Sequence, residues 1–413
     1  MKNFKDSGIE WLGEIPQDWE IKPLKAVFNQ RNEQNTNLKL CTILSLIKDI
    51  GVVPYEEKGN IGNKSKEDLK NYKIARINDL VLNKMNAAIG SLGVSAYNGL
   101  VSPIYLVFYI NNPKYLMSYY SYLFQIKSVQ KFLKIYAYGI MEIRESIDYL
   151  DFKKMSLPVP PLKVQEQIAN FLDEKCEQIA NFIEKKEKLI SLLKEQKQVL
   201  INETITKGLD KNVNFKDSGI EWLGEIPQHW NILKLKHIAS LRNQKSNNID
   251  FRIGLENIES KTGKFIPSSE VVFEEDGIGF KKGDILFGKL RPYLAKVFLT
   301  DRDGICVSEF LVLKIKSESN KFIKFLMLSS LFIDIVDSST YGTKMPRANW
   351  EFIGNLKIPL PPLKEQEQIA NFLDEKCEKI DLLIEKTKKQ IKLIKEYKTT
   401  LINQAVCGRI GKS

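Results

Sequence analysis

The sequence contains two copies of one plan. Residues 4–20 and 215–231 differ at two of seventeen positions, and a second pair of near-identical stretches follows later in each half. The segments between these repeats, roughly 21–156 and 232–357, differ strongly. Two copies are too few for a solenoid. We therefore expect a pseudo-twofold molecule in which an entry motif, a variable domain and a long helix each occur twice.

The second repeat predicts the two long helices. It reads LPVPPLKVQEQIANFLDEKCEQI from Leu157 and IPLPPLKEQEQIANFLDEKCEKI from Ile358. The Pro-Pro pairs suit the first turn of a helix, and Gly208 and Gly408 suit its far end. Apolar residues between them recur at steps of three, four and seven, which predicts a coiled-coil seam. The predicted seam residues are Ile168, Leu172, Ile179, Phe182, Leu189, Leu193 and Leu200 in the first copy and Ile369, Leu373, Ile380, Leu383, Ile394 and Leu401 in the second, where Gln390 replaces Leu189.

These helices are too long to lie on a small domain. With about 45 residues at 1.5 Å each, either helix would extend about 65 Å. We expect each to pair with the other, and a twofold axis across the pair makes them antiparallel. The alternative is a duplication whose halves pack together only for stability. That alternative does not explain why the joints and helices match while the domain interiors have diverged.

The variable segments predict mixed α and β structure. Strand-like runs occur at 79–83, 104–109, 284–288 and 310–315, and helix-like stretches occur near 115–135 and 320–336. The expected fold class is therefore α+β, with two mixed α/β domains separated by two long antiparallel coiled-coil helices. The predicted parts are the first domain with its entry motif (1–156), the first helix (157–208), the second domain with its entry motif (209–357) and the second helix (358–413).

The positive charge is concentrated in the variable domains. Residues 21–162 hold 19 basic and 11 acidic residues, and residues 232–363 hold 20 and 15, within a chain of net charge +11. The helices carry nearly balanced charge, as solvated coiled-coil flanks do. Lysine and arginine bind nucleic-acid phosphates through counterion release, so this distribution favours a nucleic-acid partner.

Several other classes of protein are disfavoured. The five cysteines are scattered without a Cys-x-x-Cys pair, and only two histidines occur, so we expect neither a disulfide framework nor a metal site. No apolar run approaches the roughly 18–20 residues that span a bilayer. We expect a cytoplasmic protein that does not bind membranes.

The repeated motifs carry a family resemblance. GIEWLGEIPQDW, PPLKVQEQIANFLDEK, ITKGLDKNVNFKDSGIEWLGEIPQHW and PPLKEQEQIANFLDEK together resemble the specificity subunit of type I restriction-modification systems, over the whole chain. The resemblance implies that each variable domain is a target-recognition domain for one half of an asymmetric, bipartite sequence in double-stranded DNA. It further implies that the helices set the spacing and dock two modification (methyltransferase) subunits, which restriction subunits join to give the nuclease.

Loops that follow strands supply the candidate DNA contacts. Arginine and lysine on such a loop suit guanine, and asparagine suits adenine. Lys84 and Lys289 could instead contact phosphates or lie at solvated strand ends. The second domain has a basic pair, Lys344 and Arg347, after its Tyr-Gly segment, whereas the first domain has only Arg144 in the matching segment. The candidate DNA-binding residues are Lys84, Asn86, Ser91, Tyr138, Arg144, Lys289, Arg291, Tyr293, Tyr341, Lys344 and Arg347.

Enzyme motifs are incomplete in this sequence. The stretch 283–290 has the spacing of a phosphate-binding Walker A loop but lacks the final Ser or Thr, and its middle is an apolar strand. The only Pro-Pro pairs lie between Val159 and Leu162 and between Leu360 and Leu363, where an adenine methyltransferase needs an Asn or Asp. We therefore predict a subunit that is not an enzyme by itself and has no cofactor. The alternatives are a self-sufficient methyltransferase or nuclease and a cytoplasmic coiled-coil scaffold for acidic proteins.

Overall fold

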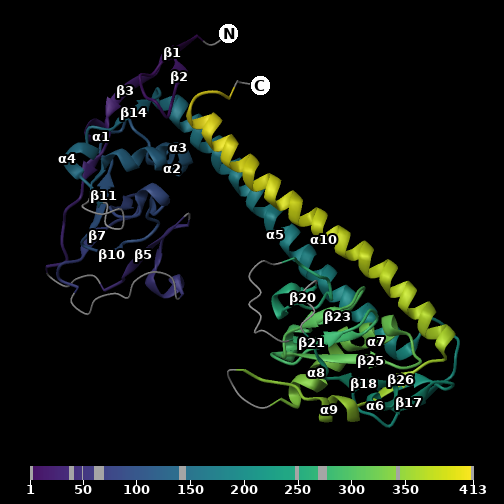
Figure 1. Ribbon diagram of the computed structural model, residues 1–413. Coiled ribbons are helices and arrows are strands. Elements are labelled where there is room, and N and C mark those ends of the chain that lie inside the picture. The colour runs from purple at the N-terminus through teal and green to yellow at the C-terminus, as the bar shows by residue number, and fades with distance from the viewer. Residues whose placement is uncertain are drawn as a thin grey trace. The chain divides into compact units, whose positions relative to one another are not determined.

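The protein consists of two compact units. A computed structural model describes residues 3–36, 41–48, 50–59, 69–138, 146–246, 251–267, 277–340 and 345–410 (Figure 1). The first unit combines Met1–Lys185 with Gln390–Ser413, and the second is Lys186–Lys389. Each unit therefore contains one entry motif, one mixed α/β domain and part of each long helix.

The entry motifs close the two domains. In each unit the motif forms a hairpin, and the next strand pairs with the strand that precedes a long helix, so both ends of the variable domain are fastened together. In the first unit these strands are β1 (Phe4–Asp6), β2 (Glu14–Pro16), β3 (Glu20–Pro23) and β14 (Ser156–Val159), and in the second β15 (Phe215–Asp217), β16 (Glu225–Pro227), β17 (Asn231–Lys234) and β26 (Lys357–Leu360).

Each domain is built on a four-stranded antiparallel sheet. The strand orders are β4-β11-β8-β9 and β18-β25-β22-β23. The first sheet contains β4 (Asn29–Gln30), β8 (Leu80–Asn83), β9 (Leu92–Val94) and β11 (Tyr105–Tyr109), and the second contains β18 (Ala239–Arg242), β22 (Ile285–Gly288), β23 (Val297–Leu299) and β25 (Phe310–Ile315).

The central strands are apolar on both faces, which explains their continuous apolar runs. Leu80 and Leu82 pack in the core that contains the helices, whereas Val81 packs in a second cluster on the opposite face. In the second unit, Ile285 and Phe287 alternate in the same way with the neighbouring Leu286. The four strand predictions are therefore confirmed within one residue.

Smaller strands and short helices complete each domain. In the first unit these are α1 (Leu24–Val27), β5 (Leu44–Ile47), β6 (Gly51–Pro54), η1 (Tyr55–Lys58), β7 (Lys73–Ala75), η2 (Ala87–Ile89), β10 (Gly99–Val101), η3 (Leu133–Tyr136), β12 (Ala137–Tyr138), β13 (Ser146–Ile147) and α4 (Tyr149–Phe152). In the second unit they are α6 (Leu235–Ile238), β19 (Lys245–Ser246), β20 (Arg252–Ile253), η4 (Leu255–Asn257), β21 (Gly277–Phe280), η5 (Pro292–Leu294), β24 (Gly304–Cys306) and α9 (Trp350–Asn355). Of these, β19, β21, β24 and β20 form a second four-stranded sheet, in that order.

Each predicted domain helix is broken into two. The first consists of α2 (Met117–Gln125) and α3 (Lys127–Phe132), and the second of α7 (Asn320–Leu328) and α8 (Ser330–Ser338). The breaks lie at Ile126 and Ser329, whose backbones are extended. Ser329 ends α7 and caps α8, because its hydroxyl accepts a hydrogen bond from the Phe332 N–H.

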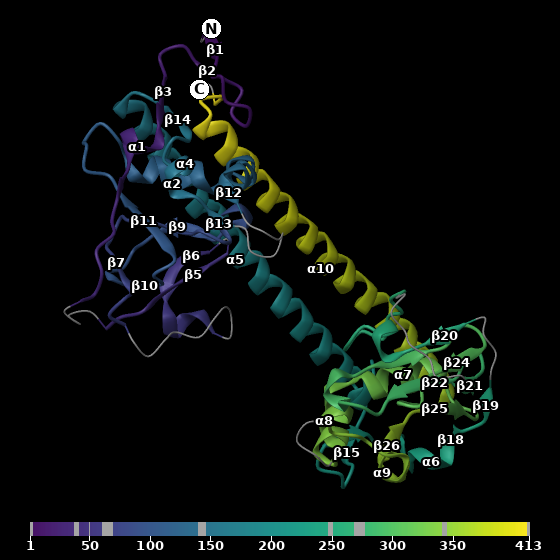
Figure 2. The ribbon, with the colours of Figure 1, turned by 60° about the vertical axis from the view of Figure 1, so that its left-hand side comes forward.

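The long helices are α5 (Leu162–Lys207) and α10 (Leu363–Val406), and they run antiparallel within each unit (Figure 2). Both end on a glycine with φ of 73°, Gly208 and Gly408, as predicted. A Cβ atom at Gly208 would lie 3.1 Å from the Trp230 ring, and one at Gly408 would lie 2.9 Å from the Trp19 ring. Glycine is thus required at each position for two reasons. The backbone there is left-handed, and the tryptophan of an entry motif leaves no room for a Cβ atom.

The predicted seam is wrong at three positions. Phe182, Leu189 and Leu383 are 38–50% exposed, whereas the buried stripe includes Ile384 and Ile391. A straight α-helix has 3.6 residues per turn, so a strict seven-residue repeat drifts off the packed face within a few turns. The buried stripe consequently moves by one residue along the helix.

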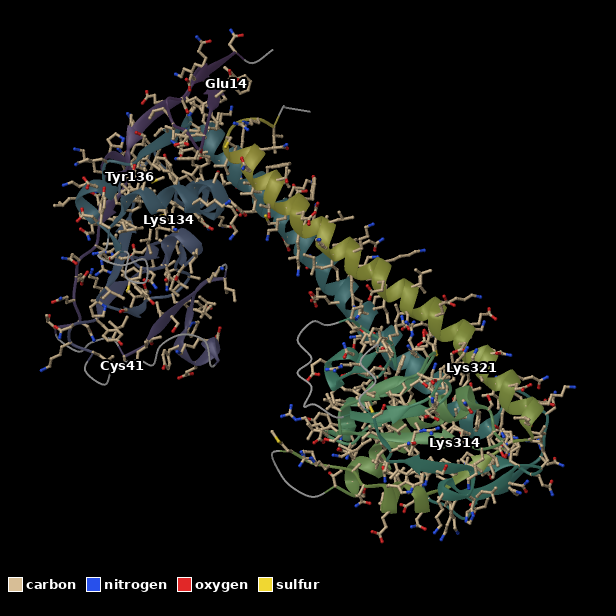
Figure 3. All side chains as sticks on the ribbon, in the orientation of Figure 1. Glu14, Cys41, Lys134, Tyr136, Lys314 and Lys321 are labelled. Atoms are coloured by element: carbon tan, nitrogen blue, oxygen red, sulfur yellow. The ribbon has the colours of Figure 1, made fainter. Side chains whose placement is uncertain are left out.

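A glutamine anchors the start of each long helix. Gln165 and Gln366 are fully buried, and each donates a hydrogen bond to the carbonyl of the first proline of its Pro-Pro pair. Each side-chain oxygen also accepts a backbone N–H from a segment that precedes a domain helix, at Leu116 and at Ser319. A further attachment occurs in the second unit, where Lys321 Nζ on α7 lies 2.8 Å from Asp374 Oδ2 on α10. Lys321 is labelled in Figure 3.

Candidate nucleic-acid interface

In the second unit, two segments far apart in the sequence form one exposed edge. The loop after β22 carries Lys289 and Arg291, and the Arg291 N–H donates to the Pro346 carbonyl at 2.9 Å. The Ala348 N–H donates to the Lys289 carbonyl at 3.0 Å, so Arg347 lies opposite Leu290. These bonds bring three of the predicted DNA-binding residues of this domain together.

The backbone of this loop is strained at two residues. Arg291 has φ of 52° and Ala295 has φ of 46°, a left-handed conformation that non-glycine residues rarely adopt. Between them, η5 presents Tyr293, which is 44% exposed. Such strain persists only where the surrounding structure maintains it, and strained residues of this kind cluster at functional sites.

Arg347 is already paired with a carboxylate. Its guanidinium makes two contacts with Glu309, 2.8 Å from Nη2 to Oε1 and 3.3 Å from Nε to Oε2. Glu309 immediately precedes β25, and both side chains remain partly exposed. A fork of this geometry can exchange its partner for a phosphate or for the edge of a base. The sequence-based prediction missed Glu309, because no motif marks a single acidic residue before a strand.

Lys289 is less exposed than the two arginines. Burial is the main cause that raises the pKa of the Cys306 thiol, to about 12, and the Lys289 ammonium acts against that increase. The ammonium therefore lies near Cys306 on β24. Tyr341 and Lys344 lie outside the described residues.

In the first unit, the loop after β8 lies between two adjoining hollows of about 410 and 460 Å³, which share Met85 and Ile104. Asn86 and Ser91 line the first hollow, and Lys84 lines the second. Asn86 is exposed, whereas Ser91 is only 5% exposed. The first hollow is also bordered by exposed apolar side chains, those of Met85, Ile89 and Ile104.

A second lysine lies close to Lys84. Burial first, and the Lys84 ammonium second, lower the pKa of Lys73. Lys73 Nζ donates to the Tyr105 carbonyl at 2.8 Å and lines the same hollow. Tyr138 is 58% exposed on β12, and Arg144 lies outside the described residues.

The first-domain residue that matches Arg347 is Ser146. The Ile147 N–H donates to the Lys84 carbonyl at 3.0 Å, just as the Ala348 N–H donates to the Lys289 carbonyl. The residue before each donor is therefore Ser146 in one domain and Arg347 in the other. Sequence comparison suggested Arg144 for this position, because spacing alone does not show which residue is hydrogen-bonded to the loop.

Both sheets share a buried ion pair that the sequence-based prediction did not identify. Arg31 binds Asp79 through two contacts of 2.6 and 3.0 Å, and Arg242 binds Asp284 through two contacts of 2.8 and 3.4 Å. The two carboxylates are 2% and 4% exposed. A comparison of the two halves could have found this pair. In each half the arginine lies at the end of the first strand of the sheet, and the aspartate directly precedes β8 or β22.

Two further features are absent from the described residues. Among them, no three or more His, Cys, Asp or Glu side chains gather in a group that could hold a metal ion. None of the helices in the described ranges combines the length and the apolar character needed to cross a membrane.

Comparison with known proteins identifies the two halves. Residues 16–200 and 227–393 each match the family model for the type I restriction modification DNA specificity domain. A Methanocaldococcus jannaschii protein provisionally described as the MjaX specificity subunit of a type I restriction enzyme is 27% identical, over 99% of this chain and 97% of its own. The MjaVIII specificity subunit of the same organism is 28% identical over 70% of each chain.

Solved structures share the fold. A chain from a type I R-M system, described for its complex assembly and conformational transition, superposes with a TM-score of 0.72 at 12% identity, over 96% of this chain and 99% of the other. The HsdS subunit from Thermoanaerobacter tengcongensis superposes with a TM-score of 0.56 at 14% identity, over 96% and 98% of the two chains.

Proposed function

The chain belongs to the type I restriction-modification DNA specificity family, and from this premise we propose that it is the DNA-recognition subunit of a type I restriction-modification complex. Each domain then reads one half of a bipartite, asymmetric target in double-stranded DNA. The observation that carries the proposal is the pair of related sheets whose loops after β8 and β22 bear different side chains. Two sheets with the same strand order but different loop side chains suit two different half-sites.

The loop chemistry suggests what each domain reads. In the second domain, Lys289, Arg291 and Arg347 carry donors that suit guanine O6 and N7, and Glu309 can accept from cytosine N4. In the first domain, Asn86 suits adenine, and apolar side chains such as Ile104 suit the thymine methyl group. Phosphate contacts from the remaining lysines would position the domains without adding specificity.

The chemistry of methylation and cleavage belongs to partner subunits in this proposal. The sequence lacks the Asn or Asp before Pro-Pro that an adenine methyltransferase needs. Two modification subunits dock on the long helices, and restriction subunits join them to give the nuclease. The isolated chain with S-adenosylmethionine should therefore neither methylate nor cut DNA.

Domain exchange tests the proposal. The chain is coexpressed with its modification subunit, and methylated adenines are mapped across the genome, where one bipartite motif is expected. Replacing residues 232–357 with the matching domain of a relative should change one half of that motif and keep the other, because base contacts are local to a domain. A change in both halves would contradict the assignment of one half-site to each domain.

The long helices provide the spacing between half-sites in this proposal. Four residues inserted between Leu193 and Leu200 add about 6 Å of helix, close to one turn. Since base pairs rise about 3.4 Å each, the gap in the methylated motif should grow by about one to two base pairs. The half-site sequences should persist, since both domains are unchanged. An active complex with the original gap would show that another element measures the distance.

A further inference from the structure

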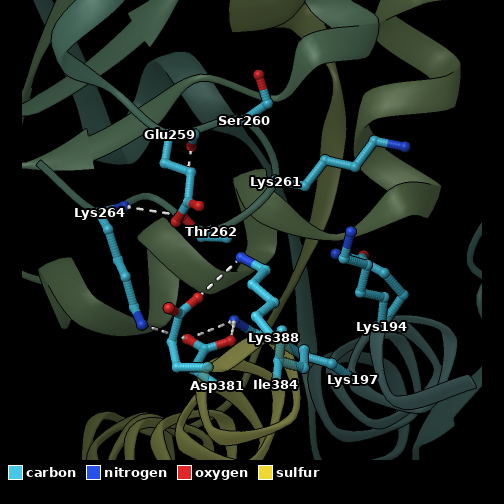
Figure 4. A pocket seen from close by; sticks show the side chains of 12 residues that line it. Lys194, Lys197, Glu259, Ser260, Lys261, Thr262, Lys264, Asp381, Ile384 and Lys388 are labelled. Carbon is cyan, nitrogen blue, oxygen red and sulfur yellow. Dashed lines mark hydrogen bonds and ion pairs between the residues drawn. The ribbon is translucent and has the colours of Figure 1, made fainter. Parts of the chain in front are cut away.

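The second unit contains a cleft between the long helices and a domain loop (Figure 4). The helices are α5 and α10, and the loop is the segment 259–264 after η4. The cavity has a volume of about 170 Å³. Five lysines and three carboxylate residues line it, so positive charge exceeds negative charge by two.

One carboxylate in the cleft is shared by two lysines. Asp381 on α10 lies 2.8 Å from Lys197 Nζ on α5 and 2.9 Å from Lys264 Nζ in the loop. Burial raises the pKa of Asp381, but the two lysines outweigh it and hold the pKa below its usual value. A second carboxylate, Glu385, is 2.8 Å from Lys388 Nζ. The two contacts at Asp381 join α10 to α5 and to the loop, and so hold the walls of the cleft together.

The two remaining lysines of the cleft are Lys194 and Lys261. Within the described ranges, no carboxylate lies at ion-pair distance from Lys194 or Lys261. The side-chain oxygen of Gln198, which also lines the cleft, is buried without a hydrogen-bond partner. Rotation of this amide would direct its NH₂ donors to the same place, because the two ends of an amide are nearly equal in shape. The cleft thus holds two lysines without a carboxylate partner in the described part of the chain, beside an unsatisfied amide.

The cleft is attached to the candidate DNA-binding loop. The Lys261 N–H donates to the carbonyls of Leu294 and Ala295, at 3.1 and 3.3 Å, and Lys261 has φ of 63°. The tip of the cleft loop is therefore fixed to the end of η5, which carries Tyr293. In the first copy of the helix, Ala180 occupies the position of Asp381, so the central carboxylate is peculiar to the second unit.

We propose that this cleft binds one phosphate group through Lys194, Lys261 and the Gln198 amide. A tetrahedral dianion matches the excess of two positive charges and accepts several charge-assisted hydrogen bonds. The phosphate comes either from the backbone of DNA bound by the second domain, which rests on the proposed function, or from a free phosphate ion.

The first experiment measures binding of inorganic phosphate to the full chain at constant ionic strength. The test variant is Lys194→Gln with Lys261→Asn, since asparagine tolerates the left-handed backbone at position 261. The matched control is Lys188→Gln, an exposed lysine on the same helix that does not line the cleft. By calorimetric titration, the test variant should bind phosphate at least about tenfold more weakly than wild type and control. Equal affinity in all three proteins, or no binding by wild type, would overturn the proposal.

The second experiment distinguishes the two sources of phosphate. The affinity of each protein for duplex DNA is measured as a function of salt. If the cleft takes a backbone phosphate, the slope of the test variant should be shallower by about one counterion, while the control keeps the wild-type slope. Weaker phosphate binding with an unchanged slope would assign the cleft to a free ion. If the proposed function were wrong, the methylation map would show no bipartite motif. The phosphate titration does not depend on that result, so the two failures can be told apart.

Discussion

The two recognition domains differ in their exposed loops and agree in their central sheets, β4-β11-β8-β9 and β18-β25-β22-β23. Both sheets have the same strand order, and both keep an arginine–aspartate pair, Arg31–Asp79 in one and Arg242–Asp284 in the other. The agreement ends at the loops. Where the second domain places Arg347, the first places Ser146. The comparison shows that a buried ion pair and a strand order can persist while the side chains on the neighbouring loops are replaced.

The largest expected effect tests the shared part of the comparison. Arg31→Met and Arg242→Met each leave a buried carboxylate without its partner, which should lower the free energy of unfolding by about 3–5 kcal/mol. Hydrogen exchange measured by mass spectrometry should show lost protection in the sheet of the substituted domain. The other domain serves as the internal control. Equal loss in both domains would mean that the two sheets unfold as one cooperative unit.

A smaller effect tests the part that differs. Arg291→Ala should weaken binding to the target by about 1–3 kcal/mol and relax one base position in one half-site, if the guanidinium pairs with a base. Asn86→Ala should do the same in the other half-site. Mapping of methylated adenines measures both outcomes. Uniform weakening on every sequence would identify a phosphate contact, and wild-type behaviour would remove the residue from the interface.

The smallest effect concerns the helices, where Asp381 of the second copy replaces Ala180 of the first. Lys197 and Lys264 hold the pKa of Asp381 below the ordinary 3.8, so the charged pair stabilises the fold above about pH 4. Asp381→Asn should therefore lower the free energy of unfolding by about 1 kcal/mol at pH 7. The difference from wild type should shrink as pH falls below about 4, when the aspartate becomes protonated. A difference that stayed constant with pH would contradict a charge-dependent role.

Much of the fold was predictable because local patterns carry it. The apolar runs at β8 and β22 predicted central strands, and the Pro-Pro and glycine signals predicted both ends of the long helices. The helix seam was predicted less well, since Leu383 and Ile384 are adjacent and equally apolar. Only the drift of a straight helix places Ile384 in the packed stripe and leaves Leu383 exposed.

The candidate site was predictable in part. Lys84, Asn86, Lys289 and Arg291 follow strands in the sequence, so their place on loops could be read directly. The partners of these loops could not, because Arg347 is brought to Lys289 by backbone hydrogen bonds across more than fifty residues. Glu309 became part of the edge for the same reason.

The twofold plan, the two long helices and the family could be inferred without the structure, because these depend on repeated motifs and on periodicities that lie along the chain. Which residue faces Lys84 or Lys289, which helix positions are buried, and which lysines near Asp381 lack a carboxylate depended on tertiary structure. Each is a matter of register between segments far apart in the chain. A shift of one residue changes which side chain occupies a site without changing the local pattern.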